Sequence, residues 1–270
     1  MGILYKIRFF KLLYRLRVIR TKTARKLYLK AKLLPKTVNV LFETKYGFKL
    51  NLDLREWIDF NIFFSGYYEK YETRYFSQKN ESGLTFFDVG ANIGYYSLMF
   101  SAKGFRCHSF EPVKNTFLKL LSNVELNSFS NTTLNNFGIS STCCSREINI
   151  SPDACGNNSL ENKFQTKQTE QITLETLDNY CLEKNIDLID LLKIDVEGHE
   201  NEVLLGASNL LYSFKIKEIF IEINDSFDES VYQFLAQNYD WYKFTKRGLS
   251  LVSKNISGNA LLILKEHVGQ

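Results

Sequence analysis

The chain alternates between short apolar runs and longer stretches with helical spacing. Apolar runs of strand length predict strands near 84–88, 106–110, 132–135, 189–194, 218–223, 240–245 and 260–264. Apolar positions three or four residues apart predict helices near 55–78, 93–103, 113–127, 175–184, 199–212 and 228–237. This alternation is typical of a mostly parallel sheet with helices on both faces. The sequence therefore predicts an α/β fold with a doubly wound, mostly parallel, seven-stranded sheet.

The segment from Phe86 to Leu98 joins the first of these strands to its helix. Asp88 ends an apolar run, and Gly90, Asn92 and Gly94 form a tight turn before the helical spacing begins. Glycine allows a close ligand approach that a side chain would block. The free N–H groups of a helix N-terminus point at whatever lies over such a turn. The segment predicts a cofactor loop, with Asp88 accepting hydrogen bonds from the ligand.

The spacing of this loop indicates which cofactor it suits. A dinucleotide loop reads G-x-G-x-x-G, whereas this one reads D-x-G-x-N-x-G, with Asn92 following Ala91. A P-loop needs Gly-Lys-Ser/Thr, and no such tripeptide follows. An acid-led glycine loop without a phosphate-binding lysine suits a ligand with a cationic, amino-acid-like end. S-adenosylmethionine is such a ligand.

A second acid, Glu111, follows the strand expected at 106–110, about one helix and one strand after Asp88. In doubly wound sheets an acid at this distance reaches the ribose hydroxyls of a nucleoside cofactor. Pro112 ends the strand and can open the next helix, where its missing N–H is no loss. We therefore expect Glu111 to bind the ribose.

A third polar group follows the strand expected at 189–194 and consists of Asp195, Glu197, His199 and Glu200. Ligands of open α/β sheets lie beyond the carboxyl ends of the strands, so this group should face the same crevice. Asp195 or Glu197 could instead cap the following helix, where acids are favoured. Four titratable residues in six positions exceed what a cap requires, so a site is favoured.

The chain resembles the FkbM-type family of S-adenosylmethionine-dependent O-methyltransferases. The resemblance lies in DVGANIGYYSL at 88–98, FEP at 110–112, ITLETLD at 172–178 and LLKIDVEGHE at 191–200, with 66–69, 204–207 and 218–223 matching in order. It covers roughly residues 50–225. It implies a class I, Rossmann-like methyltransferase fold with an antiparallel last strand. It also implies methyl transfer to a hydroxyl, usually on a sugar, a glycan or a sugar-like ring of a secondary metabolite.

With this resemblance the candidate residues fall into three groups. Cofactor-binding candidates are Asp88, Gly90, Asn92, Gly94, Glu111, Asn136, Gly138 and Asp195; catalytic candidates are Asp195, Glu197 and His199; substrate-binding candidates are Tyr68, Glu69 and Glu222. His199 titrates nearest neutrality and is the first candidate for a general base, with a surface histidine as the alternative. We predict no resident metal, although Asp195, Glu197 and Glu222 could hold a divalent ion. Residues 143–171 should form an inserted loop or hairpin over the cofactor.

The expected function is S-adenosylmethionine-dependent O-methylation of a sugar, glycan or glycosylated metabolite. The alternatives are an N- or C-methyltransferase of a small metabolite and a catalytically silent cofactor-binding module. Intact Asp88, Gly90, Gly94, Glu111 and Asp195 favour an enzyme. The chain has no Asn/Asp-Pro-Pro-aromatic tetrapeptide of the amino-methylating type and no Pro-Cys nucleophile of the cytosine-C5 type. Its acceptor cannot be read from these motifs.

Charge divides the chain into two parts. Residues 1–36 hold 12 of the 34 Lys and Arg residues and none of the 30 Asp and Glu residues. We therefore expect a basic amphipathic helical extension over 1–40 and one methyltransferase domain over 41–270. Residues 1–34 could lie on an anionic membrane surface or pack on the domain or on a second subunit. The acidic remainder would repel a polyanion, so no nucleic-acid partner is expected.

The cellular compartment is predicted from the cysteines and the N-terminal segment. Five cysteines, an odd number that includes adjacent Cys143 and Cys144, do not suggest a disulfide framework. Lys and Arg interrupt the apolar positions of the N-terminal segment, so it suits neither a membrane span nor a cleavable signal. We expect a cytoplasmic protein, with peripheral attachment to the membrane as the alternative.

Overall fold

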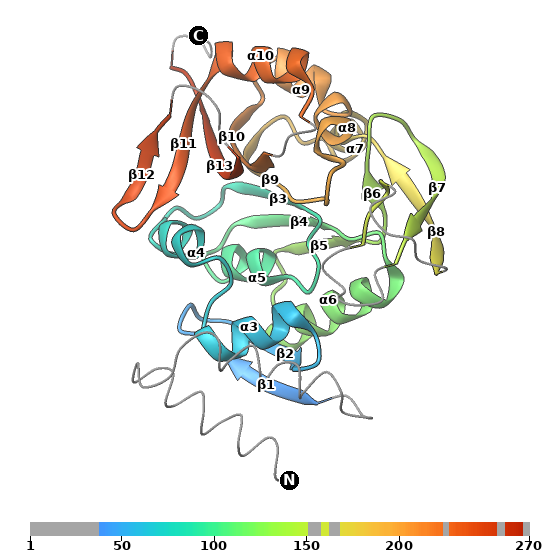
Figure 1. Cartoon of the computed structure of the whole chain (residues 1–270), viewed down its shortest axis with the longest axis vertical. Helices are drawn as coiled ribbons and strands as arrows, with labels where there is room; N and C mark the ends of the chain where they lie inside the picture. The colour runs from blue at the N-terminus through green and yellow to red at the C-terminus, as the bar shows by residue number, and fades with distance from the viewer. Residues whose placement is uncertain (1–37, 151–157, 162–167, 224–226, 253–256, 267–270) are drawn as a thin grey trace.

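An eight-stranded sheet with helices on both faces forms the centre of the protein (Figure 1). The computed structural model describes residues 38–150, 158–161, 168–223, 227–252 and 257–266. Residues 1–37 of the extension expected over 1–40 lie outside the described residues. The boundary expected at 40/41 falls within β1 (Asn39–Glu43). None of the helices in the described ranges is long and apolar enough to cross a membrane.

The strands of the large sheet are ordered β12-β11-β13-β10-β9-β3-β4-β5. Their bounds are β3 Thr85–Val89, β4 Arg106–Phe110, β5 Thr132–Asn135, β9 Ile189–Ile194, β10 Ile216–Ile223, β11 Tyr239–Thr245, β12 Gly248–Leu251 and β13 Gly258–Leu264. Parallel pairing joins β5, β4, β3, β9 and β10, whereas β13 is antiparallel to both β10 and β11. The doubly wound, mostly parallel sheet and its antiparallel last strand are thus as predicted.

The sheet has one strand more than the seven predicted. The additional strand, β12, pairs antiparallel with β11 at the edge of the sheet. Its burial falls from half-buried at Gly248 to exposed at Leu251. A four-residue edge strand with little buried surface lacks the apolar run that predicts a strand, which explains why it was missed.

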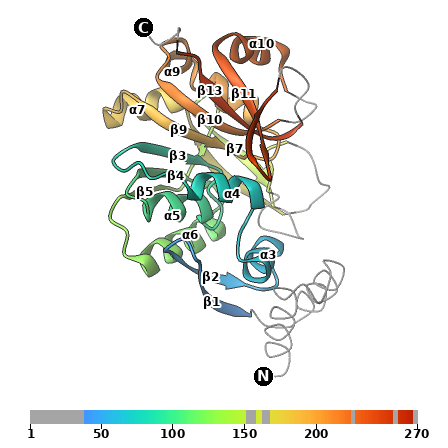
Figure 2. The same ribbon diagram turned by 90° about the vertical axis from the view of Figure 1, so that its left-hand side faces the viewer.

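Helices cover both faces of the sheet (Figures 1 and 2). One face carries α3 Trp57–Ser65, α4 Lys70–Ser77, α5 Tyr95–Ser101 and α6 Lys114–Asn127, and the other carries α7 Leu177–Lys184, α8 Glu200–Leu205, α9 Ser208–Tyr212 and α10 Glu229–Asn238. Each face has its own buried apolar cluster, the first including Phe76 and Leu98 and the second Leu177 and Leu235. Because both faces of the sheet are buried, its central strands carry apolar side chains on both faces.

Two of the predicted helices are each divided in two. The helix expected at 55–78 stops at Gly66, whose φ of 89° is left-handed and ends α3, before α4 begins at Lys70. The helix expected at 199–212 is interrupted at Gly206, between α8 and α9. A Cβ at Gly206 would lie 2.0 Å from the carbonyl oxygen of Ser140, so the chain passes too closely for any other residue.

Two smaller sheets flank the large one. β1 pairs antiparallel with β2 (Lys49–Asp53). β6 (Gly138–Ile139), β8 (Thr169–Glu175) and β7 (Cys144–Asn149) form a three-stranded sheet in that order. The antiparallel pairing of β7 with β8 agrees with the hairpin expected within 143–171, of which residues 151–157 and 162–167 lie outside the described residues.

Two asparagines of α6 attach the β1–β2 hairpin to the domain. Asn123 is buried; its Oδ1 accepts from the N–H of Asn51 at 2.8 Å and its Nδ2 donates to the carbonyl of Ile93 at 2.9 Å. Asn127 makes the same kind of pair with Lys49, at 2.7 and 2.8 Å, in exposed positions. The hydrogen bonds of the buried Asn123 should contribute more to the free energy of unfolding than those of Asn127, because water cannot easily replace a lost partner at a buried side chain.

We expect Asn123→Ala to lower the free energy of unfolding by roughly 1–3 kcal/mol, since it leaves the buried carbonyl of Ile93 and the partly buried N–H of Asn51 without their partner. The matched control Asn127→Ala should cost about 1 kcal/mol or less. Urea denaturation of the two variants measures the difference. Equal losses would show that burial of Asn123 does not determine how firmly the hairpin is held.

Candidate active site

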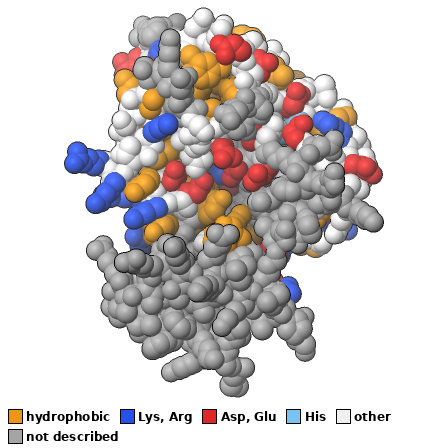
Figure 3. Space-filling view, in the orientation of Figure 1, with side chains coloured by type: hydrophobic (Ala, Val, Ile, Leu, Met, Phe, Trp, Pro, Cys, Tyr) orange, Lys and Arg blue, Asp and Glu red, His pale blue; other side chains and the backbone are white. Residues whose placement is uncertain are grey.

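A cavity of about 260 Å³ opens at the carboxyl ends of β3, β4 and β9. Eight of the predicted site residues line it: Tyr68, Gly90, Asn92, Glu111, Gly138, Asp195, Glu197 and His199. Ile148 of β7 and Leu174 of β8 complete one wall, and Trp57 and Ile58 of α3 another. Acidic side chains gather near the centre of the described surface in Figure 3. The eight predicted residues come from five parts of the sequence and lie around one space, as expected at the carboxyl ends of parallel strands.

The turn after β3 brings the backbone against the end of β9. The N–H groups of Gly90 and Ala91 both donate to the carbonyl of Phe110, at 3.1 and 3.0 Å. Gly90 has a φ of 79°, and a Cβ there would lie 2.0 Å from the carbonyl oxygen of Asp195. Glycine is therefore required both for its conformation and for this close approach. This packing fixes the turn between β3 and α5 beside the cavity, and its role in binding a cofactor stays a prediction.

Glu111 presents a fixed carboxylate to the cavity. Its Oε1 accepts from the N–H of Val113 and its Oε2 from the N–H of Asn92, both at 3.0 Å. Burial raises the pKa of Glu111 to about 7, because the two backbone N–H groups only partly offset the loss of water. Each oxygen keeps a further lone pair, so the carboxylate can accept from two neighbouring hydroxyls. This geometry suits the ribose diol expected from the sequence.

The position of Asp88 differs from the direct ligand contact that we expected. Its carboxylate is 1% exposed, and Asp88 does not line the cavity. Oδ2 accepts from the N–H of Ser97 at 3.0 Å and from its hydroxyl at 2.6 Å, while Oδ1 lies 3.2 Å from Nζ of Lys193. Asp88 therefore holds α5 and Lys193 in place beneath the cavity, and direct contact of Asp88 with a ligand stays a prediction.

Lys193 is a site residue that the sequence analysis did not select. Its ammonium is buried between Asp88 and Asp195, at 3.2 and 3.5 Å, and lies 3.3 Å from the carbonyl oxygen of Gly90. Burial alone would lower the pKa of Lys193, but the two aspartates outweigh burial and raise it above its usual value. The signal in the sequence was a lysine inside the apolar run 189–194, where an unpaired charge would be costly.

Asp195 and Glu197 reach the cavity from the loop between β9 and α8. The side chain of Asp195 is 30% exposed, so one carboxylate partner of Lys193 is accessible and the other, Asp88, is not. Glu197 has a φ of 56°, a left-handed conformation that is uncommon for a residue with a side chain. Such local strain is concentrated at binding and catalytic sites. Both residues are therefore placed to contact a ligand.

His199 lines the cavity, but both of its ring nitrogens have partners. Nδ1 lies 3.1 Å from Oε1 of Glu161, and because a carboxylate only accepts, Nδ1 donates. Nε2 lies 3.0 Å from the hydroxyl of Ser140. A buried imidazole held on both sides is well suited to fixing the loop before α8. To act as a general base, His199 would first have to lose one of these hydrogen bonds.

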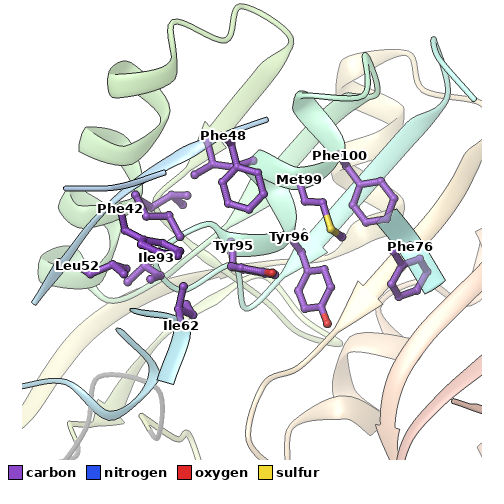
Figure 4. Packing of buried hydrophobic residues seen from close by; sticks show 14 of the residues in the cluster. Phe42, Phe48, Leu52, Ile62, Phe76, Ile93, Tyr95, Tyr96, Met99 and Phe100 are labelled. Atoms are coloured by element: carbon purple, nitrogen blue, oxygen red, sulfur yellow. The ribbon is translucent and has the colours of Figure 1, made fainter. Parts of the chain in front are cut away.

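Tyr68 and Glu69 lie in the connection between α3 and α4. Tyr68 lines the cavity and packs edge-to-face on Tyr95 and Tyr96, with ring centroids 6.0 and 6.4 Å apart. Figure 4 shows Tyr95 and Tyr96 within the buried apolar cluster of this face. Glu69 accepts from the hydroxyl of Tyr96 at 2.6 Å and from Nδ2 of Asn259 at 2.5 Å. Burial, followed by the charge of Asp195, raises the pKa of Glu69 to about 7.

Several other candidates do not line the cavity. Gly94 starts α5 with a φ of 89°, and its missing side chain makes room for Leu120 of α6. Asn136 is exposed, and its Nδ2 donates to the carbonyls of Glu111 and Pro112, at 2.9 and 3.0 Å. Both residues support the surrounding backbone, and direct cofactor contacts by them stay predictions. Glu222 stands opposite Asn259 in the β10–β13 pair, and Asn259 donates a hydrogen bond to Glu69.

The carboxylates considered as metal ligands do not form a metal-binding group here. In the part of the chain that the structure describes, no three His, Cys, Asp or Glu side chains are grouped as a metal site would require. Asp195, Glu197 and Glu222 are thus not gathered around one point. Lys193 instead neutralises part of the acidic charge near Asp195.

The chain matches the methyltransferase FkbM domain over residues 88–243, more than half of its length. It belongs to this family of methyltransferases, as the motifs predict. The matched region contains Gly90, Glu111 and Asp195, whereas Tyr68 and Glu69 precede it.

Relatives are known among proteins from an archaeon and a fungus. The chain is 30% identical over 151 residues to the hexuronic acid methyltransferase AglP of Haloferax volcanii, covering 56% of this chain and 60% of that protein. It is 27% identical over 160 residues to methyltransferase 1 of Beauveria bassiana, covering 52% and 64%. The chain therefore spans less than two thirds of either relative.

Solved methyltransferase structures also resemble the protein. An rRNA methylase from Streptococcus thermophilus has 11% identity and a TM-score of 0.43, covering 72% of this chain and 93% of that chain. TYW2 of M. jannaschii, solved with AdoMet, has 12% identity and a TM-score of 0.41, covering 86% and 87%.

The close approach at Gly90 can be tested against a matched glycine. Gly83 has the same φ, 79°, but a Cβ there would meet nothing within 4 Å. Gly83→Ala should lower the free energy of unfolding by only about 1–2 kcal/mol, the cost of left-handed backbone strain. Gly90→Ala should cost roughly 1–3 kcal/mol more, because the added carbon displaces the backbone at Asp195. Thermal and urea unfolding of both variants measure this, and equal losses would contradict the close packing of the turn on β9.

Proposed function

We propose that the protein is an S-adenosylmethionine-dependent O-methyltransferase that acts on a hydroxyl of a sugar or glycan. The observation that carries the proposal is one cavity in which the fixed carboxylate of Glu111 and the accessible carboxylate of Asp195 both face the same space. Membership of the FkbM family supports methyl transfer. Similarity to a protein named as a hexuronic acid methyltransferase supports a sugar acceptor.

The residues of the cavity fit the proposed cofactor. Glu111 would accept hydrogen bonds from the two ribose hydroxyls, and Gly90 lines the same cavity beside it. Acidic residues suit the positive charge of a sulfonium and of an α-amino group. When bound, S-adenosylmethionine supplies an activated methyl group, so the protein itself needs to position the acceptor and help to remove its proton.

Asp195 is the residue best placed to serve the acceptor hydroxyl. It is partly exposed on the cavity wall, and Lys193 fixes its position from below. A hydroxyl that donates to this carboxylate would be oriented for transfer and could lose its proton to it. His199, held by Ser140 and Glu161, is assigned to positioning the loop that carries Asp195 and Glu197. This assignment revises the role expected for His199 from its titration alone.

The binding of S-adenosylhomocysteine should weaken as the pH falls below about 7. Burial gives Glu111 a pKa of about 7, and ribose hydroxyls donate to its ionised form, so binding below pH 7 must release a proton. The dissociation constant should rise by up to about tenfold per pH unit between 7 and 5.5.

Calorimetry on matched variants tests whether Glu111 causes this pH dependence of binding. Glu111→Gln should bind about 10- to 100-fold more weakly and lose the pH dependence. Glu69→Gln should retain it, although burial also raises the pKa of Glu69 to about 7. A pH dependence that survives in Glu111→Gln would contradict the ribose contact.

The catalytic assignment predicts a separation between turnover and binding. Asp195→Asn should lower kcat by about 10²-fold or more, the scale for loss of a general base, while affinity for S-adenosylhomocysteine changes less than about threefold. His199→Gln should lower kcat less and should also lower the melting temperature. The exposed acid Asp240, changed to Asn, is the control for loss of one charge. Normal turnover of Asp195→Asn would remove Asp195 from the mechanism.

Transfer itself is tested with methyl-labelled S-adenosylmethionine and polysaccharide and lipid-linked sugar extracts of the host. We expect label in the glycan fraction, recovered after acid hydrolysis as an O-methyl sugar. Label on nitrogen or carbon would favour the alternative methyltransferase classes. Binding of S-adenosylhomocysteine without transfer to any extract would favour a silent binding module.

A further inference from the structure

Contacts of both its ring and its backbone hold Tyr68 in the cavity wall. The ring packs edge-to-face on Tyr95 and Tyr96, which lie side by side in Figure 4, with ring centroids 6.0 and 6.4 Å away. The carbonyl oxygen of Tyr68 accepts a hydrogen bond from the hydroxyl of Thr73, a buried residue of α4. The next residue, Glu69, accepts from the hydroxyl of Tyr96 at 2.6 Å. A side chain supported in this way presents its polar group in a fixed position.

Tyr68 and Asp195 are supported by the same two buried side chains, Tyr96 and Lys193. The ammonium of Lys193 lies 3.5 Å from Oδ2 of Asp195 and 5.7 Å from the ring centroid of Tyr96. The ring of Tyr96 in turn packs on the ring of Tyr68. Tyr68 and Asp195 both line the cavity. The phenol and the carboxylate therefore have positions that depend on each other, and they face the same space.

The phenol of Tyr68 and the carboxylate of Asp195 have complementary hydrogen-bonding properties. Burial raises the pKa of the phenol well above its usual value, and the charge of Asp195 raises it further. The effect of Asp195 exceeds that of Glu69, the neighbour of Tyr68 in the chain, which indicates that the phenol lies toward Asp195. A phenol that keeps its proton can donate, whereas a carboxylate only accepts. This part of the wall thus offers a ligand one donor and one acceptor.

We infer that Tyr68 determines acceptor specificity by donating a hydrogen bond to the oxygen next to the hydroxyl that is methylated. The inference rests on the proposed sugar O-methylation, in which Asp195 accepts from the reacting hydroxyl. The substrate class that fits both groups is a sugar with a vicinal diol, in which one oxygen contacts Asp195 and its neighbour contacts Tyr68. Two contacts on adjacent carbons restrict the rotation of the ring and so align the reacting oxygen with the methyl group.

This arrangement should reject a sugar that lacks the neighbouring oxygen. Such a sugar would leave the phenol of Tyr68 desolvated and without its acceptor, and a site that hydrogen-bonds a substrate oxygen discriminates strongly against the analogue without it. We therefore expect kcat/KM to fall by at least about tenfold when that oxygen is replaced by hydrogen.

The test first identifies the sugar that the full chain labels from methyl-labelled S-adenosylmethionine, among aryl glucosides, galactosides and mannosides and the sugars of the host extracts. The aryl glycoside of that sugar is then compared with analogues that are deoxygenated at each carbon next to the methylated position. One of these analogues should show the expected loss in kcat/KM. Equal kcat/KM for the parent glycoside and all of the analogues would overturn the inference and leave sugar O-methylation standing.

Tyr68→Phe tests whether the phenol causes this preference, because it removes the hydroxyl and retains the ring that packs on Tyr95 and Tyr96. It should lower kcat/KM at least about tenfold for the parent glycoside but less than about twofold for the sensitive deoxy analogue, so that the preference disappears. Affinity for S-adenosylhomocysteine should change less than about threefold. Tyr75→Phe is the matched control, since Tyr75 is a half-buried tyrosine of α4 that does not line the cavity, and it should leave both values unchanged.

Two results with these variants would overturn the role of Tyr68. One is a preference for the neighbouring oxygen that survives in Tyr68→Phe. The other is a loss of affinity for S-adenosylhomocysteine that accounts for the whole loss of activity, which would place Tyr68 against the cofactor. The proposed function fails in a different way: if the protein binds S-adenosylhomocysteine but labels no sugar from either source, sugar O-methylation is contradicted, and this inference with it.

Discussion

The buried ammonium of Lys193 holds together the parts of the chain that make the cavity. Lys193 pairs with Asp88 across the β3–β9 ladder, and its Nζ also contacts Asp195 and the carbonyl of Gly90. Removing a charge from water costs several kcal/mol, and pairing must offset this cost. Loss of the lysine would leave two carboxylates close together without their counter-ion. The end of β3, the glycine turn and the end of β9 therefore depend on one another.

This arrangement gives two aspartates of one cluster different roles. Asp88 is buried and binds the first turn of α5 through Ser97, so it supports the turn from below. Asp195 faces the cavity and remains accessible. Because Lys193 contacts both, the structural and the proposed catalytic carboxylate are coupled electrostatically.

Much of the fold follows from local patterns in the sequence. Apolar runs bounded by glycine, proline and acids predicted the seven strands, and the motifs at 88–98 and 191–200 predicted the methyltransferase family. The β1–β2 hairpin was missed because its alternation of Val40 and Phe42 is short. The helix expected at 55–78 is divided at the left-handed Gly66. Its helical character was predicted, but the break between its two halves was not. The presence of the main strands could be predicted from the sequence. The edge strand of the sheet and the breaks within helices depend on contacts with neighbouring elements.

The roles of individual site residues were harder to predict than their presence. Contacts with Ser97 and Lys193, which lie on other elements, determine the orientation of the Asp88 carboxylate. Ser140 and Glu161, which contact His199, are distant from it in the sequence, so a general base was the first hypothesis for His199. Lys193 was visible as a charge in an apolar strand, and asking what pairs with a buried lysine would have located the cluster. A sequence shows which groups are available, and packing decides what they contact.

The central claim is that Glu111 and Asp195 mark the two ends of one site, for the cofactor and for the acceptor. A crystal structure of the protein with S-adenosylhomocysteine tests this most directly. The account predicts that both ribose hydroxyls donate to the carboxylate of Glu111 and that the sulfur faces the side of the cavity formed by Asp195 and Tyr68. A ligand whose ribose lies away from Glu111, or whose sulfur points away from Asp195, would contradict it.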